Sequence, residues 1–205
     1  LVRSRGLGDV YKRQNKRNHI DFVIHGGDMS DFGVTKEFLW QRDIMNGLSV
    51  PYVTLIGNHD CLGTGAETYK AIFGPTNLSF IAGDVKFVCL NTNALEYDYS
   101  EPVPDFTFME NELTNRTDEF NKTVISMHAR PYTDVFNDNV VKMFQHYVKQ
   151  YPGIQFCTAA HTHHYRDDVI FDDGIHYVTS DSMDKRTYLV FTITPEKYEY
   201  ELVKY

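Results

Sequence analysis

The chain has 205 residues with a formal net charge of −8, and 42% of its residues are hydrophobic. This length and composition predict one globular domain with a sizeable core. No apolar run approaches the roughly 20 residues that a membrane-spanning helix needs, which excludes a transmembrane segment within the chain. The acidic balance, and the lack of Lys/Arg clusters in the body of the chain, disfavour nucleic acid as a partner.

The first fourteen residues differ from the rest. The run from Ser4 to Gln14 resembles a translated sequencing adapter of the transposon type that reads through into a gene fragment. We therefore expect residues 1–14 to be non-native and residues 15–205 to form the domain, the alternative being a basic, disordered arm. The natural start would then be missing, and any signal peptide or lipid anchor of the parent protein with it. The compartment stays open, with export or lipid anchoring as hypotheses, and the sequence does not predict the oligomeric state.

In the first two thirds of the chain, apolar runs and turn signals predict strands that alternate with helices. The expected strands are residues 20–24, 52–56, 78–81, 85–91 and 123–127. The expected helices are residues 34–47, 66–73, about 107–114, and the segment whose apolar face runs from Phe136 to Tyr151. The last third predicts strands alone: residues 154–158, 168–171, 176–180, 187–194 and 198–203.

This order of elements predicts the fold class. Alternating strands and helices favour a mostly parallel sheet covered by helices, and the terminal run of strands favours an added antiparallel sheet. We therefore predict an α/β fold with two facing mixed β-sheets flanked by helices, that is, a four-layer α/β/β/α sandwich.

Polar side chains directly follow four of the predicted strands. Carboxylate, amide and imidazole groups are ligands of divalent transition metals such as Mn, Fe, Zn or Ni. Two such ions about 3.5–4 Å apart can clamp a phosphate ester and activate water. Asp28 is the candidate bridging ligand, because Gly26 and Gly27 before it let the backbone turn tightly. The candidate ligands are Asp28, Asn58, His128, His161 and His163.

These motifs resemble those of the calcineurin-like metallophosphoesterase superfamily. The match comprises Gly-Asp-Met-Ser-Asp at 27–31, Gly-Asn-His-Asp at 57–60, His128, and His-Thr-His at 161–163. The motifs stand in the order of the family, and the resemblance spans about residues 20 to 181.

The resemblance implies a division of roles. Asp28 would bridge two divalent metal ions; Asn58, His128 and His161 would complete one site, and His163 would contribute to the other. We predict that His161 and His163, two residues apart, point to the same side of an extended backbone. His59 would be the general acid that protonates the leaving alkoxide, with Asp60 orienting its ring.

The resemblance also implies a function. The chain is expected to hydrolyse a phosphomonoester or a phosphodiester, with a small phosphate ester as substrate and metal-bound hydroxide as nucleophile. One alternative is a nuclease of the same superfamily, which the acidic charge disfavours. Another is a non-catalytic interaction module that kept the fold. Retention of His59, which would bind no metal, counts against a non-catalytic parent protein.

Two departures from the family pattern matter. Ala160 stands where the family usually has glycine, and a small residue there is compatible with the motif. The family's first motif, an aspartate, one spacer and a histidine at the end of the first strand, has no counterpart beyond Asp9-Val10-Tyr11. We therefore expect the fold to lack its first strand, the site of His163 to be incomplete, and exposed apolar edges to lower stability. Whether this chain is active stays open.

Overall fold

The structure is a computed structural model that describes residues 19–205. The predicted adapter segment, residues 1–14, and the expected start of the domain at residue 15 lie outside the described residues. Within residues 19–205, no helix is long and apolar enough to cross a membrane.

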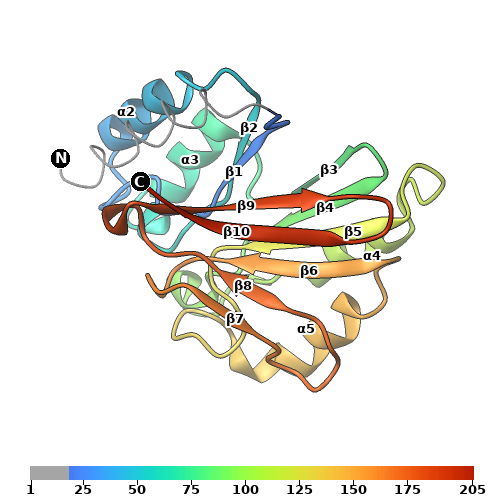
Figure 1. The fold of residues 1–205 in the computed structure, drawn as a ribbon. Coiled ribbons are helices and arrows are strands. Elements are labelled where there is room, and N and C mark those ends of the chain that lie inside the picture. Colours follow the sequence, from blue (N-terminus) through green and yellow to red (C-terminus); the bar gives the residue numbers. More distant parts are fainter. Residues whose placement is uncertain (1–18) are drawn as a thin grey trace.

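A six-stranded sheet forms the centre of the fold (Figure 1). Its inner strands are parallel because each returns through a helix or a long connection, whereas both edge strands run antiparallel to their neighbours. Its strands, in spatial order, are β3 (Leu78–Ala82), β4 (Val85–Leu90), β5 (Lys122–Met127), β6 (Ile154–Ala159), β8 (Tyr177–Thr179) and β7 (Arg166–Asp168). The predicted hairpin around Gly83-Asp84 is the β3–β4 pair.

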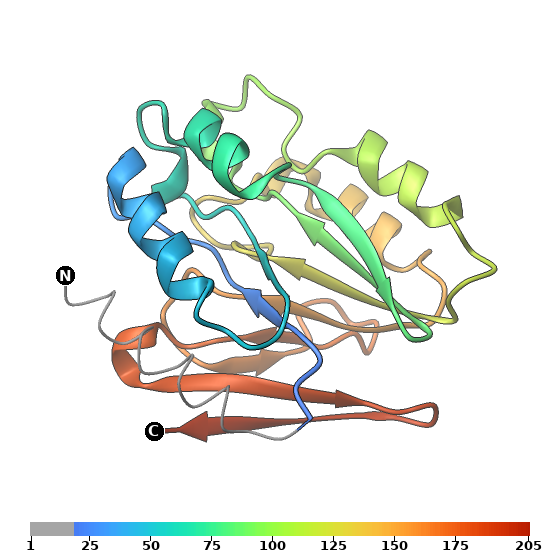
Figure 2. The ribbon, with the colours of Figure 1, turned by 90° about the horizontal axis from the view of Figure 1, so that it is seen from above.

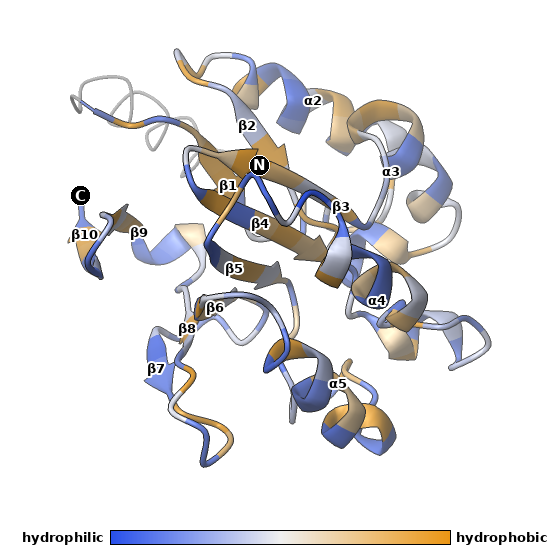
Figure 3. Cartoon of the chain, turned by 90° about the vertical axis from the view of Figure 1, so that its right-hand side faces the viewer, coloured by the Kyte–Doolittle hydropathy of each residue, from blue (hydrophilic) through white to orange (hydrophobic). Residues whose placement is uncertain are grey.

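Two helices, α4 (Phe106–Thr114) and α5 (Val141–Val148), cover one face of this sheet (Figure 2). Every residue of β4 and β5 is buried, as expected for strands that are covered on both faces. Figure 3 shows this as hydrophobic colour along β4 and β5. Met109 and Phe144 from the two helices are fully buried against the sheet.

Two strand pairs lie over the other face of the six-stranded sheet. Strands β1 (Val23–His25) and β2 (Tyr52–Thr54) are parallel, and β9 (Thr187–Ile193) and β10 (Tyr198–Lys204) form an antiparallel hairpin. One apolar cluster joins both pairs to the sheet, with Phe22 from beside β1, Phe191 from β9 and Phe156 from β6. The rings of Phe156 and Phe191 stack with their centroids 4.6 Å apart.

Helices α2 (Thr35–Met45) and α3 (Gly65–Phe73) cover β1 and β2 from outside. Phe38, Met45 and Tyr69 are buried there, with Val23 and Tyr52 packed against them. The order of layers is therefore helices, six-stranded sheet, two strand pairs, helices, which confirms the predicted four-layer α/β/β/α arrangement.

The structure differs from the sequence prediction in three places. The strand expected at 168–171 is β7 at Arg166–Asp168, and the long helix expected to reach Tyr151 ends at Val148. Within residues 19–205, the second layer is two separate strand pairs and not one continuous sheet. Short 3-10 turns complete the element order: η1 (His59–Cys61), η2 (Ala94–Tyr97), η3 (Asp138–Val140) and η4 (Met183–Lys185).

Candidate metal centre and active site

Asp60 accepts hydrogen bonds from two loops, one that follows β1 and one that follows β2. Its side chain is fully buried. Its Oδ1 accepts hydrogen bonds from the Ser30 backbone N–H at 2.8 Å and the Ser30 hydroxyl at 3.0 Å, and its Oδ2 accepts one from the Gly57 N–H at 2.9 Å. Burial raises the pKa of Asp60 to about 7 although these donors lower it. The expectation that Asp60 orients His59 is therefore wrong, because both of its oxygens serve to fix the loops.

Glycines let these loops approach each other closely. Gly27 has a φ of +102° and Asp28 a φ of 56°, so the chain turns sharply as it leaves β1. A Cβ atom added at Gly57 would lie 2.1 Å from Asp28 Oδ1, which no side chain tolerates without movement. The tight turn expected before Asp28 is confirmed, and Gly57 provides the second half of the close approach.

Four of the five predicted ligands come together at the ends of four strands. Asn58 Oδ1 lies 3.1 Å from His128 Nε2 and 3.0 Å from His161 Nδ1. Asp28 Oδ1 lies 3.5 Å from His128 Nε2. We call these four residues the donor cluster. Their role as metal ligands stays a prediction, but the structure brings them to one point from β1, β2, β5 and β6.

The second nitrogen of each histidine in the cluster faces a hydrogen-bond acceptor. His128 Nδ1 lies 2.7 Å from the Gly26 carbonyl, and His161 Nε2 lies 2.6 Å from Asp134 Oδ1. These nitrogens therefore carry the ring protons and donate, which leaves His128 Nε2 and His161 Nδ1 with lone pairs. Burial lowers the pKa of His128, so its ring stays neutral near pH 7.

The donor cluster therefore presents three lone pairs, from two imidazoles and the Asn58 oxygen, to one another. Neutral acceptors do not hydrogen-bond to each other, and a cation between them would satisfy all three. Histidines that ligate a metal usually donate their other N–H to a carbonyl or a carboxylate, as both do here.

The spacing of the donors also fits a metal ion. Ligand atoms held about 2.1 Å from one ion at right angles lie about 3 Å apart, which matches the separations in the cluster. Among residues 19–205, no group of three or more His, Cys, Asp or Glu side chains is arranged to hold an ion by itself, and the donor cluster also contains the Asn58 amide oxygen. By the chemistry of the donor set, the residues fit one divalent transition metal.

His163 is the fifth predicted ligand. It lines the same cavity as Asp28, and its carbonyl accepts a hydrogen bond from Lys185 beside η4. His161 and His163 have φ values of 64° and 57°, so the segment is not the extended backbone that we expected. Left-handed backbone at a residue other than glycine is uncommon and concentrates at functional sites.

His59 stands at the edge of the donor cluster, at the start of η1. Its backbone N–H donates to Asp28 Oδ1 at 3.1 Å, which links it to the predicted bridging ligand. Its ring Nδ1 lies 2.9 Å from the Asp31 carbonyl and donates to it. The Asp31 carbonyl therefore orients the ring, and Nε2 is the atom left to hold or release a proton.

Sequence reasoning missed Asp134, which lies in the loop after β5 and matches no motif. Only its contact with His161 reveals it. His25 makes a structural contact in the loop that leaves β1: its Nδ1 accepts a hydrogen bond from the Gly27 N–H at 3.3 Å. Burial lowers the pKa of His25 to about 4, in spite of the nearby Asp28 carboxylate.

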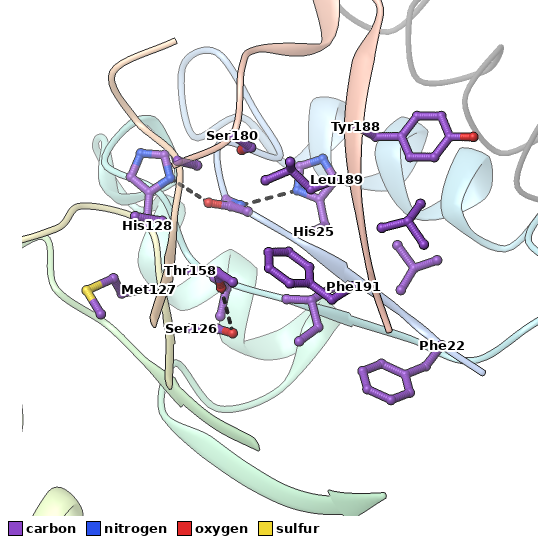
Figure 4. Close-up of a pocket in the computed structure, with 18 of the residues that line it drawn as sticks. Phe22, His25, Ser126, Met127, His128, Thr158, Ser180, Tyr188, Leu189 and Phe191 are labelled. Carbon is purple, nitrogen blue, oxygen red and sulfur yellow. Dashed lines mark hydrogen bonds between the residues drawn. The ribbon is translucent and has the colours of Figure 1, made fainter. Parts of the chain in front are cut away.

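Next to the donor cluster, the molecule contains a cavity of about 1070 Å³ (Figure 4). Side chains from β1 and β9 line it, including Phe22, His25, Leu189 and Phe191, and Phe156 lines it from the six-stranded sheet. Asp28, His128 and His161 of the donor cluster also line this cavity.

Comparison with known proteins places this geometry in a family. The family model described as calcineurin-like phosphoesterase matches residues 3–165. The chain belongs to the calcineurin-like phosphoesterase family. Members of this family generally use divalent metal ions, in agreement with the donor cluster.

Individual relatives agree with this assignment. A 3',5'-cyclic-nucleotide phosphodiesterase of Nostoc sp. is 26% identical over 124 residues, which are 60% of this chain. The match spans only 46% of the length of that relative. A dimetal phosphatase from Danio rerio has the same fold, with a TM-score of 0.70 at 11% identity, over 89% of this chain and 79% of that chain. The protein TT1561 of Thermus thermophilus gives a TM-score of 0.65 at 12% identity, over 98% and 94% of the two chains.

Proposed function

We propose that this chain is a metal-dependent phosphoesterase that hydrolyses phosphomonoesters or phosphodiesters at a dinuclear centre. The observation that carries the proposal is the donor cluster, in which His128 Nε2, His161 Nδ1 and Asn58 Oδ1 converge beside Asp28. Family membership and the similarity to a cyclic-nucleotide phosphodiesterase support phosphate esters as the substrate class. Bound divalent ions would lower the pKa of water and neutralise charge on the phosphate oxygens.

The residues of the chain divide this work. Asn58, His128 and His161 would hold one ion, and Asp28 would bridge to a second ion beside His163. Gly26 and Asp134 accept the outer ring protons of His128 and His161, so the lone pairs of both rings stay directed at the ion.

His59 would act as the general acid. The Asp31 carbonyl holds its Nδ1–H, so a proton on Nε2 is the one available for the leaving oxygen. Its backbone N–H on Asp28 Oδ1 keeps it next to the predicted bridging ligand. Protonation of a leaving alkoxide by a positioned side chain typically contributes a factor of about 10²–10⁴ to the rate.

A small ester fits the surroundings of the site better than a nucleic acid does. The described residues that line the cavity include no Lys or Arg that would contact a polyanionic backbone. The acidic residues among them are Asp21, Asp28, Asp31, Glu37, Asp84, Asp181 and Asp184.

The role of His59 as general acid can be tested with two phosphate esters that have different leaving groups. His59→Gln should slow hydrolysis of an alkyl phosphate by about 100-fold or more and that of p-nitrophenyl phosphate much less, because nitrophenolate leaves without a proton. His164→Gln is the matched control, since His164 is exposed and its ring hydrogen-bonds to the nearby Thr162 carbonyl. Equal losses on both esters would refute the general-acid role.

The test of the metal centre is the metal content after loading with manganese or zinc, measured by elemental analysis. Two ions per chain would support the dinuclear proposal, and Asn58→Ala should lower the content. One ion per chain would show that residues 1–205 hold a mononuclear centre and would contradict the dinuclear part. No bound ion would refute the metal-dependent function for this chain.

A further inference from the structure

The 3-10 turn η2 lies between the loop after β2, which carries His59, and the loop after β5. On one side, Asn93 Nδ2 donates a hydrogen bond to the Ile56 carbonyl at 2.9 Å. On the other side, the Leu95 N–H donates to the Val135 carbonyl at 3.2 Å. These two contacts hold η2 beside both loops, on the side of the candidate site where His59 stands.

Glu96 of η2 is a half-buried carboxyl group at this place. Burial raises the pKa of Glu96, although the nearby His59 lowers it. Within residues 19–205, the Glu96 side chain makes no hydrogen bond or ion pair. The groups of the site that interact electrostatically with Glu96 are His59, Asp28, His161 and Asp134.

The loops around Glu96 contain very few basic residues. In the described segments 28–33, 56–64, 91–101 and 128–138, Arg130 is the one Lys or Arg. Its guanidinium donates to Asp168 Oδ2 on β7 at 3.1 Å, so its charge is already paired. Glu96 is therefore partly withdrawn from water without a Lys or Arg of these segments to balance it. A cationic group brought by a ligand would provide that balance.

Exposed apolar side chains lie on the segments that meet at His59 and Glu96. The Asp31 carbonyl, which accepts from the His59 ring, directly precedes Phe32, whose side chain is 70% exposed. The Leu62 N–H donates to the His59 carbonyl at 3.4 Å. Aromatic faces attract cations, and quaternary ammonium groups are commonly bound against them. The exposed apolar side chains of these segments include Phe32, Leu62, Leu95 and Tyr99.

We propose that Glu96 selects phosphate esters whose leaving alcohol carries a positive charge, namely esters of amino alcohols and of quaternary ammonium alcohols. The Glu96 carboxylate pairs with the ammonium group, and the exposed rings of Phe32 and Tyr99 provide aromatic surface for its alkyl groups. A leaving alcohol that carries a carboxylate or a second phosphate is repelled at the same place.

This selectivity rests on the proposed phosphoesterase function, because the general acid His59 defines the side of the site from which the alcohol leaves. In the reaction, the oxygen of water bonds to phosphorus and the bond from phosphorus to the alcohol oxygen breaks. The alcohol oxygen takes the proton from His59 Nε2. The alcohol is therefore released beside η2, where Glu96 contacts its charged group.

The charge preference can be tested with a matched pair of esters. One has choline as the leaving alcohol, and the other has a neutral carbon analogue in which a tert-butyl group replaces the trimethylammonium group. Each is used as the monoester and as the methyl diester, because the proposed function allows both. We expect the metal-loaded chain to favour the choline ester about tenfold in kcat/KM, as for an ion pair with a cation–π contact. High ionic strength should reduce this preference.

Two variants make the same change of charge at neighbouring positions. Glu96→Gln keeps the shape of the side chain and removes its charge, so the preference for the choline ester should fall to about twofold or less. Asp98→Asn is the matched control on an exposed side chain of the same segment. Its preference should stay within about twofold of that of the parent chain, because an exposed charge is well screened.

A binding measurement separates this selectivity from catalysis. Choline titrated into the metal-loaded chain should shift the NMR signals of the Glu96 and Leu95 amides, and the neutral alcohol should shift them much less. Glu96→Gln should weaken the choline response.

The outcomes distinguish the two proposals. Equal kcat/KM for the two esters, or a preference that Glu96→Gln leaves unchanged, would overturn the role of Glu96 while the phosphoesterase function stands. Failure to hydrolyse any of the esters would contradict the phosphoesterase function. In that case, choline-dependent shifts at Glu96 would still support a cation site at η2, and their absence would overturn it.

Discussion

Asp134 gives the sharpest test of how the donor cluster is oriented. Its Oδ1 lies 2.6 Å from His161 Nε2, and His161 directs its other nitrogen at Asn58. The His161 contact lowers the pKa of Asp134, so the group is a carboxylate at neutral pH. We predict that Asp134→Ala weakens metal binding because the His161 ring loses the partner that fixes its proton on Nε2.

The magnitude follows from the contact. A hydrogen bond to a charged group contributes about 1.5–3 kcal/mol, and the Asp134 side chain is 81% exposed, which places this one at the low end. About 1.4 kcal/mol corresponds to a tenfold increase in the dissociation constant for Mn²⁺ or Zn²⁺. Isothermal titration calorimetry on the metal-free protein measures this dissociation constant directly.

The control is Asp118→Ala, which makes the same change of charge and size at an exposed residue remote from the cluster. Both variants should have the same Tm as the parent without metal. If Asp134→Ala and Asp118→Ala bind metal equally well, within twofold, Asp134 does not position His161 and the reasoning is refuted.

Three further perturbations test other parts of the fold. Burial holds the pKa of His25 at about 4, so only the unfolded chain takes up its proton between pH 6.5 and pH 4, and stability falls as the pH is lowered through this window. Between about pH 6.5 and about pH 5, the free energy of unfolding should fall by about 2 kcal/mol because of His25. Urea titrations should show a smaller fall in the variant His25→Asn. Gly57→Ala places a Cβ atom 2.1 Å from Asp28 Oδ1. We expect the overpacked loop to lower the stability derived from Tm by about 1–3 kcal/mol and to weaken metal binding. An unchanged metal affinity would contradict this expectation. Lys86→Met breaks a buried ion pair of 2.8 Å with Glu112 and should lower the free energy of unfolding, measured with urea, by about 3–5 kcal/mol. The double variant that also carries Glu112→Gln should recover part of this stability. A loss under about 1 kcal/mol in Lys86→Met would show that the pair is solvated.

The sequence predicted those parts of the site that depend on residue type and on strand ends. His128 directly follows an apolar run, and Asn58 follows another after Gly57. Residues at the carboxyl ends of neighbouring strands meet at one edge, so their convergence could be inferred. The four-layer fold followed in the same way from the order of strands and helices. Whether these residues bind metal is the next question for experiment.

Contacts between loops could not be predicted in this way. The family resemblance implied that Asp60 orients His59, but the oxygens of Asp60 face Ser30 and Gly57 from the two loops. Asp134 lies in a loop whose path no periodicity specifies, and only the folded chain brings it to His161. Such partners depend on backbone direction over a few residues, which hydrophobic patterns do not encode.

The donor cluster and the second layer of strands differ in what holds them together. The cluster is fixed by buried contacts that are complete within the described chain, including Asp60 to both loops and Gly26 to His128. The second layer consists of two strand pairs that share an apolar cluster but, within residues 19–205, no backbone pairing with each other. Hairpins and two-stranded ribbons are marginal alone, so β9–β10 should open at lower free energy than β4 or β5.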